Sequence, residues 1–143
     1  MATIFFGIPP GVSVGDTFND RMSLVEHKLH RNTQRGIDGN GSDGSSAIVV
    51  SGGYVDDYDL GDEILYTGEG GNDPVTGRQI AHQSIDSPGN AGLIKSMQER
   101  KPVRVIRSSN HNSPFSPRSG YRFDGLFYVQ EYQLVTGKDG FKI

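Results

Sequence analysis

The 143-residue sequence predicts an α+β domain in which a curved β-sheet or small β-barrel carries a few short helices on its outside. The length is that of one domain, since domains most often have about 100–150 residues. The 20 glycines are about double the average usage of ~7%, which favours many turns between short strands. The 7 phenylalanines and 6 tyrosines supply a core and argue against a disordered chain.

The first 46 residues predict one helix between two irregular segments. Residues 1–15 are rich in glycine and proline and are expected to form an extended arm. A helix is predicted near 19–28, with Asp16 or Asn19 as its N-cap. The apolar residues there have helical spacing: Phe18, Met22, Val25 and Leu29. Residues 31–46 contain four glycines among serine and asparagine, so a long loop is expected.

The rest of the chain predicts several strands and one further helix. Strands are expected where β-branched and aromatic residues gather, at 47–50, 63–66, 103–107 and, as one or two strands, 121–135. A helix is expected over 90–101, which carries three apolar residues at helical spacing and ends before Pro102. Loops rich in glycine, proline or serine are expected at 68–77 and 108–119.

Composition excludes several classes of protein. The absence of cysteine excludes a disulfide framework, a thiolate zinc site and a cysteine nucleophile. No apolar run approaches the ~18–20 residues of a membrane helix. Residues 1–10 lack the basic region of a signal peptide. We therefore expect no membrane partner and a cytoplasmic location.

The charges are unevenly distributed along a chain whose net charge is −3. Residues 54–77 contain seven acids and no Lys or Arg, and residues 95–122 contain seven bases and one acid. A local basic face can bind phosphates on an acidic protein, because salt screens charges beyond ~8–10 Å. We assign Arg104 and Arg118 to such contacts. Two solvated faces of opposite sign are the alternative. Arg104 and Arg107 also alternate within a strand, so one of them could pair with an Asp instead.

The acidic segment also contains two tyrosines that can form a clamp. Tyr54 and Tyr66 bracket it, and a strand–turn–strand arrangement would set them face to face around a flat ring. Stacking of a base on an aromatic ring contributes ~1–3 kcal/mol, and an Asp between the tyrosines can accept hydrogen bonds from an amino group. The alternatives are a core tyrosine pair beside an acidic surface turn, or a calcium loop. The candidate calcium ligands are Asp57, Asp59, Asp62 and Glu63, but their spacing does not match the EF-hand template.

Other catalytic and metal motifs are absent from the sequence. The four histidines form no H-E-x-x-H pair, and Gly68-x-Gly70-Gly71 lacks the Lys-Ser/Thr of a phosphate loop. No serine lies in a nucleophile elbow. We therefore predict no catalytic residue, no cofactor and no metal for this chain.

Several runs, in order, resemble the SRA (SET and RING associated) domain, also called YDG. They include Ser51-Gly-Gly-Tyr54, Asp56-Asp57, Gly61-Asp62, Tyr66-Thr-Gly68 and Tyr121-Arg-Phe-Asp-Gly-Leu-Phe-Tyr-Val129. The resemblance spans residues 7–143, and it implies a crescent-shaped, twisted β-barrel similar to the PUA fold, with flanking short helices.

The resemblance implies a function in reading DNA. The family recognises 5-methylcytosine, or in some members 5-hydroxymethylcytosine, by flipping it out of duplex DNA. In bacteria it resembles the sensor half of modification-dependent restriction enzymes, often fused to an HNH nuclease. We therefore expect residues 1–143 to be a single non-catalytic domain of a longer protein with a C-terminal nuclease. In a eukaryote, the expected location is the nucleus.

The resemblance also implies roles for individual residues. Tyr54 and Tyr66 are similar to the pair that sandwiches the flipped base, and Asp57 to the acceptor for the cytosine N4 amino group. Thr67 is similar to the residue at the Watson–Crick edge. The remaining pocket residues are small and lie beside the ring: Ser51, Gly52 and Gly53.

Two loops are expected to fill the gap left by the flipped base. The thumb corresponds to Thr33, Gln34 and Arg35, and the finger to 76–79. In the finger, Arg78 or Gln79 is the wedge towards the orphan guanine, and Val75 or Thr76 faces the base's 5-position. The finger reads Gly-Arg-Gln where the mammalian one is Asn-Lys-Arg, so a preference for hemimethylated DNA does not transfer.

Two other functions stay open. A base-flipping enzyme such as a glycosylase is one, although the pocket has no Lys nucleophile and Asp57 is assigned to base recognition. An RNA-binding PUA-like module is the other, and competition between DNA and RNA would separate it from a DNA reader.

Overall fold

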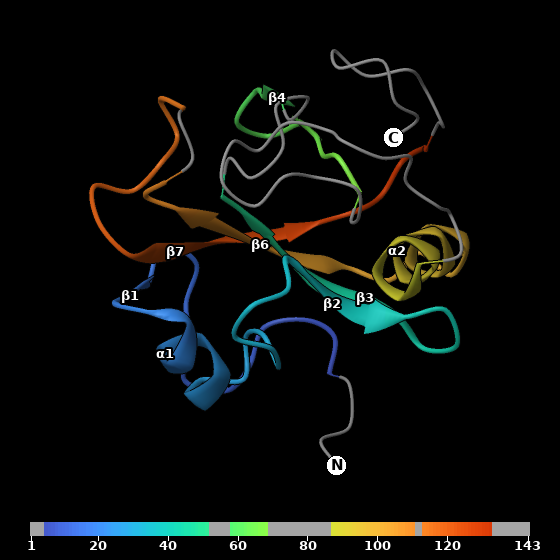
Figure 1. Ribbon diagram of the computed structural model, residues 1–143, viewed down its shortest axis with the longest axis horizontal. Helices are drawn as coiled ribbons and strands as arrows, with labels where there is room; N and C mark the ends of the chain where they lie inside the picture. Colours follow the sequence, from blue (N-terminus) through green and yellow to red (C-terminus); the bar gives the residue numbers. More distant parts are fainter. Residues whose placement is uncertain (1–4, 52–57, 69–86, 111–112, 133–143) are drawn as a thin grey trace.

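The computed structural model describes residues 5–51, 58–68, 87–110 and 113–132 (Figure 1). These residues form seven strands and two helices. In chain order they are β1 (Thr17–Phe18), α1 (Arg21–Glu26), β2 (Ile37–Asn40), β3 (Gly44–Val50), β4 (Tyr58–Asp59), β5 (Ile64–Leu65), α2 (Pro88–Gln98), β6 (Val103–Ser108) and β7 (Tyr121–Phe127).

The strands form one twisted sheet and one small hairpin. The five-stranded sheet has the order β1-β7-β6-β3-β2, and β4 pairs with β5 on its own. β3 and β6 are parallel, and the other neighbours are antiparallel. The predicted α+β class and the sheet with few short helices are confirmed. Among the described strands the sheet stays open, with β1 and β2 at its edges.

Both faces of the sheet are covered, which explains why every residue of β3 and β6 is buried. Alternate side chains point to opposite faces of a strand. Val49 and Ile106 pack with Phe123 in the apolar layer beside α1. Val50 and Val105 pack in the second layer, beside the hairpin and α2. Figure 1 shows α1 and the β4 hairpin on opposite sides of the sheet.

A β-bulge lies between β6 and β7. The register of the pair shifts between Arg104 and Ile106. Gly125, opposite this shift, has a φ of 109° that side-chain-bearing residues rarely adopt. The extra residue changes which positions share a face: Phe123 and Leu126 belong to the α1 layer, and Phe127 to the other.

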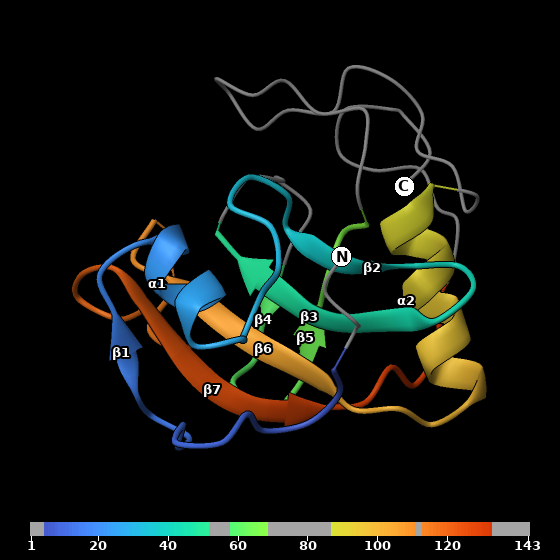
Figure 2. The ribbon, with the colours of Figure 1, turned by 90° about the horizontal axis from the view of Figure 1, so that it is seen from below.

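Helix α2 approaches the β2–β3 turn closely because the contact is made by small residues (Figure 2). The Ser45 N–H donates to Ser96 Oγ at 2.9 Å, and Ser96 Oγ donates to the Ser45 carbonyl at 2.8 Å. A Cβ at Gly92 would lie 2.2 Å from Ser45 Oγ, so a larger residue would push the helix away.

The structure corrects the sequence-based elements in several places. The N-cap of α1 is Asp20, whose Oδ1 accepts the Ser23 N–H at 2.8 Å, not Asp16 or Asn19. The segment 31–46, predicted to be a loop, contains β2 and the start of β3. Strand β1 was not predicted.

The C-terminal strand is also shorter than predicted. Within 121–132, β7 ends at Phe127, and the rest of the predicted range, 133–135, lies outside the described residues. No helix of the described residues is long and apolar enough to cross a lipid bilayer.

Candidate functional site

The β4–β5 hairpin leads directly into two of the predicted pocket residues, Tyr66 and Thr67. Its strands pair over only two positions on each side, and the turn is closed by a hydrogen bond from the Leu60 N–H to the Glu63 carbonyl at 2.8 Å. Gly61 in this turn has a φ of 95°, which favours glycine. Four predicted pocket residues lie outside the described residues: Gly52, Gly53, Tyr54 and Asp57.

The side chain of Tyr66 is hydrogen-bonded to the end of β3. Its ring is half-buried against the second apolar layer, and its hydroxyl donates to the Val49 carbonyl at 3.3 Å. Thr67 beside it is buried, and Ser51, two residues beyond Val49, is exposed. The structure thus brings Tyr66 to the strand end that Ser51 follows.

A buried arginine links the hairpin to the sheet. Arg107 on β6 donates Nε to Asp59 Oδ2 at 2.7 Å and Nη2 to Asp59 Oδ1 at 2.8 Å. Nη2 also donates to the Gly61 carbonyl at 2.6 Å. The two side chains are 6% and 1% exposed. Burial alone lowers the pKa of Arg107, but hydrogen bonds and charge from Asp59 and Asp124 outweigh it and raise the pKa above its ordinary value.

Residues of the Tyr121–Val129 run form further contacts with Arg107, on the side away from the hairpin. Asp124 Oδ2 accepts from Arg107 Nη1 at 3.1 Å, and Asp124 Oδ1 accepts from Arg122 Nε at 2.5 Å. Arg122 also donates to the Phe115 carbonyl, and the Arg107 guanidinium lies 5.4 Å from the Phe115 ring centroid. The Arg and Asp of this run therefore connect the hairpin, β6 and the loop before β7.

The predicted thumb, Thr33 to Arg35, is exposed at its tip and held at its base. Asn32 Oδ1 accepts the N–H groups of Gln34 and Arg35, both at 2.7 Å. From the first turn of α1, Arg21 Nη2 donates to the carbonyls of Asn32 at 2.7 Å and Arg35 at 2.5 Å. The loop is therefore shaped by side chains before any ligand binds.

His30 is a further anchor of this loop. It is fully buried; its Nδ1 accepts the Asn32 N–H at 3.1 Å, and its Nε2 donates to the Gly36 carbonyl at 3.3 Å. Burial, followed by the nearby charge of Arg21, lowers the pKa of His30 to about 4, and the charge of Asp38 opposes this only in part. The imidazole is therefore neutral at pH 7, which suits the one donor and one acceptor role it has here.

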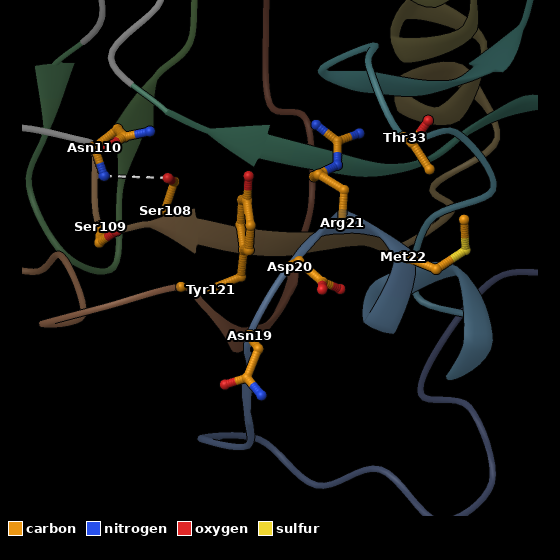
Figure 3. A pocket seen from close by; sticks show the side chains of 10 residues that line it. Asn19, Asp20, Arg21, Met22, Thr33, Ser108, Ser109, Asn110 and Tyr121 are labelled. Carbon is orange, nitrogen blue, oxygen red and sulfur yellow. Dashed lines mark hydrogen bonds between the residues drawn. The ribbon is translucent and has the colours of Figure 1, made fainter.

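A cavity of about 640 Å³ lies beside the thumb (Figure 3). Most of its lining residues are polar, and they come from four segments of the chain: Asn19, Asp20, Arg21, Met22, Thr33, Ser108, Ser109, Asn110, Gly120 and Tyr121. Of the described residues expected around the flipped base, none lines it; it is a separate feature that borders the thumb. Its hydroxyl, amide and guanidinium groups can donate hydrogen bonds to a polar ligand.

The expectation that Arg104 contacts a DNA phosphate is wrong. Its side chain is 1% exposed. Nε donates to the Leu29 carbonyl at 2.8 Å, and Nη1 donates to the carbonyls of Phe5 and Gly7 at 2.7 and 2.9 Å. Burial lowers the pKa of Arg104 to about 10, so it is still charged at pH 7. Arg104 ties the N-terminal segment to the sheet.

The basic stretch 95–122 is therefore not one phosphate-binding face. Arg107 and Arg122 belong to the network under the hairpin, and Lys95 and Lys101 pair with Glu99 at 3.1 and 2.9 Å. Arg118 is exposed, and its phosphate contact stays a prediction. The finger residues Thr76, Arg78 and Gln79, and Val75 before them, lie outside the described residues.

The calcium loop that was left open as an alternative would use Asp59 as one of its ligands. In the structure, the carboxylate of Asp59 is instead paired with Arg107. Asp59 accepts both prongs of the Arg107 fork. Among the described residues, no three His, Cys, Asp or Glu gather in a group that could hold a metal ion.

The sequence analysis missed three residues of this site: Arg21, His30 and Asn32. Each acts through contacts with the thumb. His30 stands in the run Leu29-His-Arg31, which also resembles the SRA domain, but the resemblance implied no role for it. For Arg107, the strand alternation did indicate that an arginine of β6 could pair with an Asp.

Comparisons with known proteins identify the family. The chain belongs to the SAD/SRA domain family, whose sequence model matches residues 5–143. A UHRF1-like protein of Cryptococcus neoformans is 41% identical over 142 residues, which cover 92% of this chain and 42% of that protein. The chain thus spans less than half the length of this curated relative.

Solved structures agree with this assignment. The modification-dependent TagI restriction endonuclease superposes with a TM-score of 0.93 at 46% identity, covering 99% of this chain and 50% of that one. The SUVH5 SRA domain bound to fully hydroxymethylated CG DNA superposes with a TM-score of 0.80 at 38% identity, covering 96% and 88%. The predicted resemblance to the SRA domain is confirmed.

Proposed function

We propose that this chain is a reader of modified cytosine in double-stranded DNA, and that it flips the modified base into a pocket between Tyr54 and Tyr66. The observation that carries the proposal is the fixed position of Tyr66: its ring packs on the sheet, and its hydroxyl is bonded to Val49. A preset aromatic wall can offset part of the few kcal/mol that base flipping costs. Similarity to an SRA domain bound to hydroxymethylated DNA supports this function.

Recognition of cytosine follows from hydrogen-bond polarity. Asp57 accepts from the N4 amino group, and Thr67 contacts the Watson–Crick edge. Thymine presents O4, an acceptor, at the same place, and an unpaired buried polar group costs ~1–3 kcal/mol. Gly52 and Gly53 let the backbone approach the ring, with Ser51 beside them.

The two loops act on the duplex around the flipped base. Thr33, Gln34 and Arg35 approach from the minor-groove side on the preshaped thumb. From the other groove, the finger contributes Thr76, Arg78 and Gln79. Arg118 contacts a phosphate.

The reader is the sensor domain of a modification-dependent restriction enzyme, and an HNH-type nuclease domain of the same protein cuts the DNA. Similarity to TagI, of which the chain covers 50%, supports this assembly. The chain itself binds and does not catalyse. Such a protein acts where DNA is accessible, in the cytoplasm of a bacterium.

The test is a titration by fluorescence anisotropy with three duplexes that differ at one base: cytosine, 5-methylcytosine or 5-hydroxymethylcytosine. We expect both modified duplexes to bind more tightly than the plain one. Ser51 offers a hydroxyl beside the ring, so the two modified bases should differ less than about tenfold, or ~1.4 kcal/mol. Equal affinity for all three duplexes, or tighter binding of RNA of the same sequence, would refute the proposal.

A further inference from the structure

We propose that Arg107 is a positioning residue for the base pocket: it sets the orientation of the β4–β5 hairpin and, through it, of Tyr66 and Thr67. This inference rests on the proposed function. It concerns a residue that contacts neither DNA nor the base, and it gives the arginine and aspartate of the Tyr121–Val129 run a role in recognition.

The hairpin needs an external attachment because it is very short. Two strands of two residues each make few ladder hydrogen bonds, and an isolated two-stranded hairpin is marginally stable at best. Ile64 and Tyr66 pack against the sheet, but apolar contacts are not directional. Besides the bond of the Tyr66 hydroxyl to Val49, Arg107 supplies three directional contacts, because it donates to both carboxylate oxygens of Asp59 and to the Gly61 carbonyl.

The Arg107 fork is itself held in place from behind. Asp124 accepts from Arg107 Nη1 and from Arg122 Nε, so it fixes the plane of the guanidinium. Phe115 lies against the same guanidinium, and its ring would be 2.9 Å from a Cβ at Gly61. The turn of the hairpin therefore rests on a ring that also contacts the arginine. A planar five-donor group suits this arrangement, whereas a lysine can make only point contacts.

The orientation of the hairpin matters because base recognition is geometric. Stacking requires the tyrosine ring to be parallel to the flipped base, and Thr67 follows the same ring in the chain. A pocket that is correct in composition but loose in position binds poorly. A loosened hairpin should thus impair the modification-dependent part of binding and leave phosphate contacts unchanged.

The same strand offers a matched control, Arg104. Both arginines lie on β6, both are buried, and both bind acceptors of a neighbouring segment. Arg104 points to the α1 side of the sheet and holds Phe5, Gly7 and Leu29, whereas Arg107 points to the hairpin side. Replacement of either by Lys keeps the charge and removes the fork.

The first measurement is hydrogen–deuterium exchange of the free protein, followed on peptides that cover 58–68. We expect at least tenfold faster exchange of this segment in Arg107→Lys and less than threefold change in Arg104→Lys, which should instead loosen residues 5–7. If the segment exchanges equally in wild type and Arg107→Lys, the arginine does not position the hairpin. If Arg107→Lys fails to fold, Asp124→Asn should show the same local effect to a smaller degree, and its absence overturns the inference.

The second measurement is the ratio of affinities for modified and plain duplexes. Arg107→Lys should reduce this ratio at least tenfold, with plain-duplex affinity changed less than threefold, whereas Arg104→Lys should preserve the ratio. An equal fall of both affinities in Arg107→Lys would mean a general structural role. A wild-type ratio of one would refute the proposed function instead, and the exchange experiment would still decide whether Arg107 holds the hairpin.

Discussion

The hydroxyl of Tyr66 lies 3.0 Å from the point where a Cβ of residue 36 would stand. Gly36 ends the thumb, and its carbonyl accepts the Val49 N–H at 2.8 Å. Tyr66 donates to the carbonyl of the same Val49. One position of β3 thus holds both the predicted thumb and the tyrosine of the proposed base pocket, and only a residue without a side chain leaves room between them.

Gly36→Ala should therefore displace the Tyr66 ring by a few tenths of an ångström. We expect a three- to tenfold loss of affinity for the modified duplex, about 0.7–1.4 kcal/mol. Gly41→Ala is the matched control, because its Cβ would meet Ala91 Cβ at 3.2 Å, far from the pocket. Anisotropy titrations of both variants would check this, and equal losses in the two would contradict it.

Tyr66→Ala should remove ~1–3 kcal/mol of binding to the modified duplex, because one stacking surface is lost. Tyr66→Phe keeps the ring and removes the hydroxyl that bonds to Val49, so its loss of affinity should be smaller. Tyr128→Ala, an exposed tyrosine after β7, serves as the control and should bind like wild type. Unchanged affinity in Tyr66→Ala, with an intact circular dichroism spectrum, would exclude a stacking role.

The buried His30 should make stability depend on pH. Its pKa in the folded state is about 4, whereas an unfolded histidine has about 6.5, so between these values only the unfolded chain binds the proton. Stability is thus full above pH 6.5 and falls as the pH drops towards 4, by roughly 3 kcal/mol in all. The charged groups facing His30 are Arg21 and Asp38.

Urea unfolding at several pH values between 7 and 4.5 measures this dependence. His30→Gln should be less stable at pH 7 but should lose less stability across the same range. If both proteins lose the same amount, other groups cause the pH dependence.

Arg118 and Arg104 should respond differently to charge reversal. Arg118→Glu should weaken binding of modified and plain duplexes about equally, and should reduce the slope of log affinity against log salt by about one phosphate, or ~0.9. Arg104→Glu should prevent folding, because it leaves a charge and several carbonyls buried without partners. A loss restricted to the modified duplex in Arg118→Glu would contradict a phosphate contact.

Both helices are followed by a basic residue in the left-handed region: Lys28 at φ 63° and Arg100 at φ 54°. Glycine adopts this conformation without strain, so Arg100→Gly should stabilise the protein by ~0.5–1 kcal/mol. Thermal unfolding would check this, with Gln98→Gly at the end of α2 as a control that should be destabilising rather than stabilising.

The central elements were predictable because their patterns are local. The apolar run Ala47–Val50 and the helical spacing around Leu93 indicate a strand and a helix without reference to other parts of the chain. β2 has a single apolar residue, Ile37, and becomes a strand through its pairing with β3. Gly39 in β2 signals a turn in sequence, yet here it prevents a clash, because a Cβ would lie 2.2 Å from Ser45 Oγ.

For the candidate site, the sequence predicts several of its residues but not the contacts that hold them. Tyr66 and Thr67 stand in a family motif, whereas the contacts that hold them join residues far apart in sequence. Arg107 and Asp59 are 48 positions apart, and Arg21 and Arg35 are 14 apart. A sequence does not distinguish a buried arginine from one on the surface. For this reason the sequence predicts a DNA-phosphate contact for Arg104, which the structure shows to be buried.

The parallel pairing of β3 with β6 has a consequence for how such readers diversify. The chain leaves the sheet at Ser51 and returns to the adjacent strand at Val103, so the predicted pocket and finger lie within one excursion between neighbouring strands. Parallel neighbours require a long connection, and its length is not constrained by the ladder. Within the described part of this connection, Arg107 holds the hairpin, the Tyr66 hydroxyl bonds to Val49, and helix α2 bonds to Ser45. If the proposed pocket is right, we expect that base preference can be exchanged between relatives by transplanting this excursion together with Arg107, while the rest of the sheet is kept.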